Sequence, residues 1–304
     1  MRPAAVIASC LGLAMLVSVY PLPAAEVQET AQKSPSITIR MAGGWRIIET
    51  PNFCCWCQLP EDEAIQLAES CEVWRKRLRT TWNPHAERLH WTPKCEIYIH
   101  PSREAYNTTL RRPGDSSVGS TILSFDQGIT VARRIDVRAD ASDWSNAALP
   151  HELTHVVLGE RFGGRPLPRW ADEGIAMLSE STDKHRNRLE NLQKLLSANV
   201  TCSIADVLSY RRLPVPHLRD AYYGQSLALT SLLIHKSTPA QFADFLEDSG
   251  TTGIEAALQS HYGIQDIEEL QQLWNGWARE PSKIKFVSLS IQVGHAADVA
   301  SAVP

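Results

Sequence analysis

The spacing of apolar residues divides this chain into a first part rich in strands and a second part that is helical. Stretches with β-branched residues predict strands at residues 36–48, 95–100 and 129–137. A helical pattern at about residues 61–82 separates the first two of these strands. From residue 145 onward the pattern predicts helices around residues 151–158, 173–176, 184–198, 221–236, 239–248, 254–262 and 266–279. Strands followed by helices are typical of an α+β fold.

The first of the later helices carries the sequence His151-Glu152-Leu153-Thr154-His155. Two histidines four positions apart lie on one face of a helix, where both imidazoles can reach a single metal ion. Glu152 is rotated by about 100° from His151, so it lies close to the metal without binding it. This is the position that a general base for metal-bound water must take.

A carboxylate on the following helix would complete the metal site. Glu173 follows His155 by eighteen positions and begins the next apolar run. Two histidines and one carboxylate leave a fourth coordination position open, as a catalytic zinc site requires. Asp172 is the alternative ligand, but it points about 100° away from Glu173, so only one of the two can face the metal.

With these residues the chain resembles the gluzincin clan of zinc metallopeptidases, which pair His-Glu-x-x-His with a downstream Trp-x-x-Glu-Gly-type helix. More narrowly, it is similar to the peptidase-MA-like group of bacterial secreted proteins, most closely over residues 130–180. The resemblance implies a zincin-like fold with a β-sheet over the motif helix. It also implies one Zn²⁺ per chain, bound by His151, His155 and Glu173, with Glu152 as general base and proton shuttle.

The same resemblance implies a role for a tyrosine and for a strand. Tyr223 stands three positions before Ser226, as in similar Tyr-x-Gln-Ser stretches, and its hydroxyl is expected to stabilise an oxyanion. Tyr222 and His217 are alternatives, and packing of both tyrosines in the core is another interpretation. The strand at 129–137 is expected to be an edge strand that binds an extended peptide substrate through its backbone.

A zinc-bound histidine usually donates its second N–H to a carboxylate or a carbonyl. Thermolysin-like enzymes place an acid one turn after the ligand glutamate, where this chain has Met177. The candidates for such a partner are therefore Glu180, Asp140 and Asp143.

Residues 1–25 have the pattern of a signal peptide. Arg2 precedes an uncharged stretch, and small residues precede Glu26. The apolar core of about 17 residues is too short for a stable membrane span, and no later segment is suitable for one. Cys10 faintly resembles the cysteine of a lipoprotein box, but the apolar core mostly follows it. We therefore expect a secreted or periplasmic protein.

The expected organisation has four parts. They are a signal peptide at 1–25, an N-terminal α/β part with the substrate-edge strand at 26–144, a helical zinc-binding part at 145–280, and a tail at 281–304. Six cysteines follow the leader, at positions 54, 55, 57, 71, 95 and 202. An even number in an exported chain favours disulfides, although the sequence does not select a pairing. Cys54-x-x-Cys57 is alternatively a second metal or redox site, but no second pair accompanies it.

The charge balance narrows the range of partners. A net charge of −4, from 30 basic and 34 acidic residues, gives no reason to expect nucleic acid or an anionic membrane. The basic run at 75–79 is interpreted as a solvated helix face. The sequence thus predicts a zinc metallopeptidase that hydrolyses a peptide or protein substrate. The alternative is a non-catalytic zinc-stabilised protein that binds peptide or envelope material, and a zinc hydrolase of another bond also fits.

Overall fold

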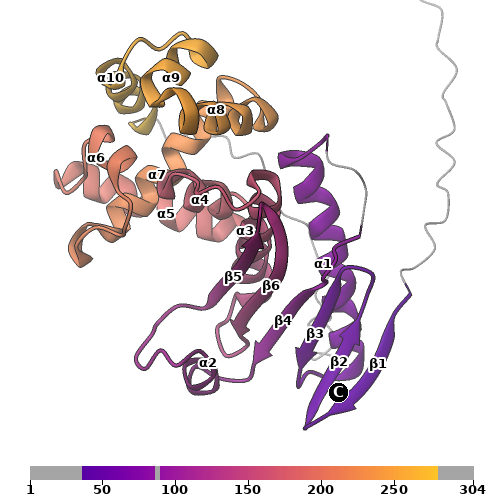
Figure 1. Ribbon diagram of the computed structural model, residues 1–304. Coiled ribbons are helices and arrows are strands. Elements are labelled where there is room, and N and C mark those ends of the chain that lie inside the picture. The colour runs from indigo at the N-terminus through magenta and orange to yellow at the C-terminus, as the bar shows by residue number, and fades with distance from the viewer. Residues whose placement is uncertain (1–35, 86–89, 280–304) are drawn as a thin grey trace, which may run out of the picture. The chain divides into compact units, whose positions relative to one another are not determined.

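A mixed sheet and a set of helices make up residues 36–85 and 90–279, which are the residues that the computed structural model describes (Figure 1). The signal peptide expected at 1–25 and the tail expected at 281–304 lie outside the described residues. Within the described part, all but two of the helices follow the last strand, as the predicted α+β order requires. No helix of this part has the length and apolar character needed to span a membrane.

Six strands form one sheet in the spatial order β1-β2-β3-β4-β6-β5. Their bounds are β1 Thr38–Ala42, β2 Trp45–Glu49, β3 Phe53–Cys57, β4 Cys95–His100, β5 Gly119–Asp126 and β6 Ile129–Arg138. Neighbouring strands β3, β4 and β6 run parallel, whereas the pairs β1–β2, β2–β3 and β5–β6 are antiparallel. The sheet is therefore mixed.

Two helices belong to the first half, α1 Glu61–Trp82 and α2 Arg103–Leu110. The later helices are α3 Leu149–Phe162, α4 Arg169–Met177, α5 Thr182–Ser197, α6 Ile204–Ser209, α7 Arg219–His235, α8 Pro239–Thr252, α9 Ile254–Tyr262 and α10 Ile267–Ala278. Each helix expected from the sequence is present. The short helices α2 and α6 were not predicted, because few apolar positions fall within so few turns.

The predictions for the strands were correct in part. The strands expected at 95–100 and 129–137 are confirmed as β4 and β6. The strand expected at 36–48 is instead the β1–β2 hairpin, because Gly43 and Gly44 turn the chain with φ values of 55° and 80°. Strands β3 and β5 were missed.

The prediction that the 129–137 segment is an edge strand was wrong. Strand β6 pairs with β4 on one side and with β5 on the other, so neighbouring strands use its backbone groups. Strand β5 is the edge strand at this end of the sheet, and it contacts α3. Any peptide that extends this end of the sheet would therefore pair with β5.

One face of the sheet carries both α1 and α3. The strand register places Cys55, Ile97, Ile135 and Thr121 side by side across β3, β4, β6 and β5. Cys55 contacts Cys71 of α1 at one end of this row, and Thr121 contacts Glu152 of α3 at the other. The sheet thus lies against α3, the helix that carries the His-Glu-x-x-His motif, as Figure 1 shows.

The six cysteines are free thiols in the structure, so the predicted disulfides are not found among the described residues. Alternation along β3 buries Cys55 and Cys57 on one face and places Cys54 on the other. Cys54 and Cys57 therefore cannot bind one metal ion together. In residues 36–85 and 90–279, no cluster with the donors of a metal site contains a cysteine.

The interpretation of residues 75–79 as a solvated face was wrong for two arginines. Arg75 and Arg79 are each only 8% exposed. The guanidinium of Arg75 lies 4.6 Å from the ring centroid of Trp91, and Arg79 pairs with Glu160 of α3 at 3.1 Å. Because these arginines are one helical turn apart, they face inward together and connect α1 to α3, the helix of the His-Glu-x-x-His motif.

The helices α4 and α7 cross closely at Gly174. A Cβ atom there would lie 2.1 Å from the Thr230 hydroxyl and 2.8 Å from the Ser226 carbonyl oxygen. Only glycine therefore allows this approach without a shift of one helix.

We expect Gly174→Ala to lower the free energy of unfolding by about 1 to 3 kcal/mol, because the added methyl group overpacks the crossing. Gly250→Ala is the matched control. It lies in α8, where no atom is within 4 Å of the place that the added methyl group would take, and removing a helical glycine should stabilise the protein by about 0.5 to 1 kcal/mol. Denaturant unfolding measures both. Equal effects of the two substitutions would contradict the assignment of Gly174 to a close crossing.

Candidate metal centre

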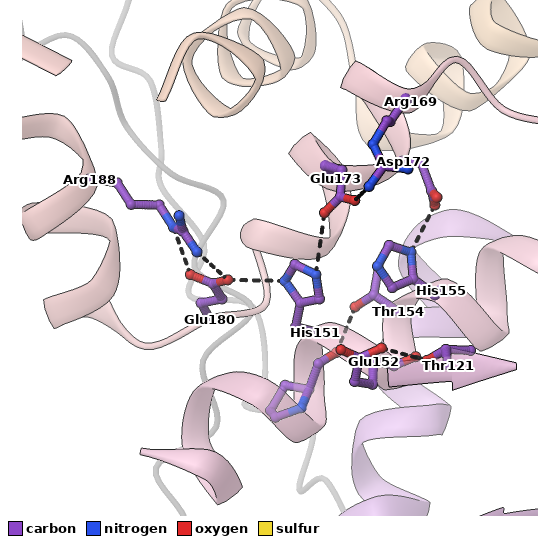
Figure 2. A network of polar contacts seen from close by, with 11 residues as sticks. Thr121, His151, Glu152, Thr154, His155, Arg169, Asp172, Glu173, Glu180 and Arg188 are labelled. Carbon is purple, nitrogen blue, oxygen red and sulfur yellow. Dashed lines mark hydrogen bonds and ion pairs between the residues drawn. The ribbon is translucent and has the colours of Figure 1, made fainter. Parts of the chain in front are cut away.

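His151 and His155 lie one turn apart on α3, and Glu173 of α4 faces them (Figure 2). One donor atom from each of the three residues lies within 4.8 Å of the other two. Nε2 of His151 is 3.7 Å from Oε2 of Glu173. Two donors that are each about 2.1 Å from a tetrahedral ion lie about 3.4 Å apart, so the spacing fits a shared metal.

The local sequence explains how α3 and α4 come together. Helix α3 ends at Phe162 and is followed by Gly163, whose φ of 56° is left-handed, and α4 begins directly after Pro168. This short connection returns the chain, so that Glu173 faces the motif helix. The hydroxyl of Thr154 on α3 hydrogen-bonds the Pro150 carbonyl and Ser179, which fixes the helix against the turn that follows α4.

Carboxylates bind the outer nitrogens of both histidines. Nδ1 of His151 lies 3.0 Å from Glu180, and Nδ1 of His155 lies 2.9 Å from Asp172. A carboxylate can only accept, so each Nδ1–H donates and each Nε2 is left for a metal ion. Arg188 in turn donates two hydrogen bonds to Glu180, at 2.8 and 2.9 Å.

These contacts resolve two open alternatives. Asp172 is the partner of His155 and lies outside the ligand cluster, so the alternative ligand assignment was wrong. Among the three candidates for a histidine partner, only Glu180 contacts His151 or His155. Asp140 accepts from the backbone N–H of Arg103, and Asp143 pairs with Lys184.

The cluster strongly attracts positive charge. Burial lowers the pKa of His151, but the carboxylates of Glu173 and Glu180 outweigh burial and raise it to about 10. Burial raises the pKa of Glu180, but His151 and Arg188 dominate and lower it to about 2. The arrangement therefore suits a bound cation.

Glu152 projects from α3 toward the edge strand. Its carboxylate is largely buried, and the Thr121 hydroxyl donates a 2.7 Å hydrogen bond to its Oε2. Strand β5 also passes close at Gly119, where a Cβ atom would lie 2.7 Å from Oε1. Strand β5 thus orients the predicted base.

The two tyrosines of α7 differ in their surroundings. Tyr222 is fully buried in the core. Tyr223 lines the same cavity as His151, Glu152 and Arg169. His217 is exposed in the turn before α7 and is not part of the cavity wall. Core packing therefore describes Tyr222, and Tyr223 is the tyrosine that can meet a ligand.

A cavity of about 860 Å³ opens over the ligand cluster. Gly119, Thr121, Leu123 and Phe125 of β5 form one wall, and residues of α4, α5 and α7 form the other. The volume is in the upper part of the range for small-molecule sites and is sufficient for several residues of a peptide.

Four residues around the centre were not predicted from the sequence. They are Thr121, Arg169, Arg188 and, as a histidine partner, Asp172. Helical spacing could have indicated Arg169, which precedes Glu173 by one turn. Thr121, Arg188 and Asp172 could not be found in this way, because a local sequence pattern does not show how their elements pack against the site.

Comparison with protein families matches residues 93–280 to a model described as the Peptidase MA superfamily. This chain belongs to the Peptidase MA superfamily. The matched region begins just before β4 and contains the ligand cluster, Glu152 and Tyr223. The predicted resemblance and the zincin-like α+β fold are thereby confirmed, and the protein is peptidase-like. No curated protein matches the chain.

Proposed function

We propose that this protein is an exported zinc-dependent metallopeptidase that binds one Zn²⁺ through His151, His155 and Glu173. The observation that carries the proposal is the convergence of these donors beside a buried carboxylate, Glu152, at one wall of a large cavity. Two imidazoles and one carboxylate are a frequent ligand set of catalytic zinc. Export rests on the signal-peptide pattern of residues 1–25 alone.

Each residue of the centre has a distinct task in this proposal. Zinc, when bound, would polarise the scissile carbonyl and lower the pKa of water. Glu152 takes the proton from the attacking water and passes it to the leaving amine. The hydrogen bond from Thr121 fixes one oxygen of Glu152 and leaves the other for the proton. Tyr223 donates a hydrogen bond to the oxyanion of the tetrahedral intermediate.

The edge strand supplies a place for the substrate. Strand β5 has one edge without a neighbouring strand in the described sheet, and it forms a wall of the cavity. An extended peptide that pairs with this edge would run past the ligand cluster with alternate side chains pointing toward α3. The geometry therefore favours peptide substrates over compact ones.

A non-catalytic protein that binds peptide or envelope material on the same strand is the rival proposal. A purely structural metal site has no use for a base, yet Glu152 lies beside the ligands with its carboxylate oriented by Thr121. This arrangement favours the enzyme.

We expect Glu152→Gln to leave zinc content unchanged and to slow hydrolysis of a diverse peptide library by at least about 100-fold, since base catalysis typically contributes 10² to 10⁴. The glutamine keeps the shape of the side chain but cannot accept the proton. Glu190→Gln, an exposed position on α5, is the control and should be neutral. A zinc-loaded wild type that cleaves nothing, or a Glu152→Gln variant that cleaves as fast as wild type, would leave the binding protein as the better account.

Tyr223→Phe should raise the barrier by on the order of 2 to 4 kcal/mol, seen in kcat rather than in KM, because the oxyanion forms only along the reaction. Tyr222→Phe removes the neighbouring hydroxyl from the core and should leave kcat within about 3-fold of wild type. Steady-state kinetics on one cleaved peptide compare the two. If Tyr222→Phe is the slower enzyme, the assignment of the two tyrosines is wrong.

A further inference from the structure

Arg169 contacts the ligand carboxylate from the side away from the histidines. It is the first residue of α4 and stands one turn before Glu173. Its Nη2 donates a 3.1 Å hydrogen bond to Oε1 of Glu173. Figure 2 shows the guanidinium on one side of this carboxylate and His151 on the other.

The two oxygens of Glu173 thus have different partners. Oε2 faces Nε2 of His151 at 3.7 Å, and Oε1 binds Arg169. The terminal torsion of a glutamate is broad, so nothing intrinsic to the side chain sets this division. The single charge-assisted hydrogen bond from Arg169 fixes Oε1 and leaves Oε2 directed at His151.

The two partners differ in exposure. The Arg169 side chain is 36% exposed in the cavity wall, whereas the Glu173 side chain is only 14% exposed. The carboxylate end of this contact is therefore shielded from solvent, unlike that of an ion pair between two exposed side chains, which contributes little.

We propose that Arg169 is a positioning residue that holds Glu173 with one oxygen directed at the metal and thereby sets the affinity for zinc. This inference rests on the proposed function, because it requires that Glu173 bind the ion. Arg169 acts through Glu173 and is not itself a ligand.

The charge of Arg169 and its positioning role predict opposite results. A guanidinium next to a divalent cation repels it, so by charge alone the loss of Arg169 should tighten zinc binding. If Arg169 holds the ligand, its loss should weaken binding by about 10- to 100-fold, as found for residues that orient metal ligands.

Arg165 provides a matched control for charge. It lines the same cavity, but its guanidinium pairs with Glu247 of α8, which is not a ligand. Removal of Arg165 takes the same charge from the same cavity and leaves the contact with Glu173 intact.

The test is the zinc dissociation constant, measured by competition with a chelator on the full chain. Arg169→Met should weaken binding by at least about 10-fold, and Arg165→Met should remain within about 3-fold of wild type. Arg169→Lys keeps the charge but replaces the rigid guanidinium donor with a flexible ammonium, so it should also weaken binding, by at least about 3-fold. Circular dichroism checks that each variant is folded. If Arg169→Met does not fold, Arg169→Lys is the variant that tests the inference.

Wild-type affinity or tighter binding in the folded Arg169 variants would overturn the inference, as would an equal loss in Arg165→Met. Failure of the wild type to bind zinc is a different result. It would refute the proposed metal site, so zinc binding by the wild type is measured before any variant is compared.

Discussion

The structure around the candidate metal centre depends on the balance between its carboxylates and the cationic groups that contact them. Glu152, Asp172, Glu173 and Glu180 surround the two histidines, and carboxylates are costly to enclose unless each has a cationic or hydrogen-bonding partner. The surrounding carboxylates raise the pKa of His151 to about 10, although burial alone would lower it. A metal ion competes with this proton for the same imidazole. The cluster is therefore organised for a cation at its centre, and two arginines at its rim, Arg169 and Arg188, balance the charges of Glu173 and Glu180.

This balance also links the centre to the rest of the molecule. Arg188 of α5 binds Glu180, and Arg169 of α4 binds Glu173, so the cluster is held from two helices besides α3. On the far half of α3, Glu160 binds Arg79 of α1 and the indole N–H of Trp91. Both of these partners precede the region matched by the family model, which begins at residue 93. The N-terminal part therefore supports the motif helix from outside the matched region.

Residues close together in sequence were predicted well, because helical geometry alone relates them. His151, Glu152 and His155 share one helix, and a run of apolar residues fixed the next helix around Glu173. Asp172 was considered as an alternative ligand because the helical rotation angle shows where a side chain points but not which group it contacts, which here is Nδ1 of His155. Strand β5 was missed because an edge strand with one solvated face has a weak apolar pattern, and its neighbour β6 was taken for the edge. The burial of Arg75 and Arg79 likewise depends on Trp91 and Glu160, which no local pattern brings together.

The central claim is that one zinc ion binds between His151, His155 and Glu173. Anomalous diffraction at the zinc edge tests it most directly, on crystals of protein that has been stripped with a chelator and refilled with one equivalent of zinc. A single strong peak is expected within about 2.2 Å of Nε2 of both histidines and of an oxygen of Glu173. A peak at the cysteines of β3, or none at the three predicted ligands, would contradict it.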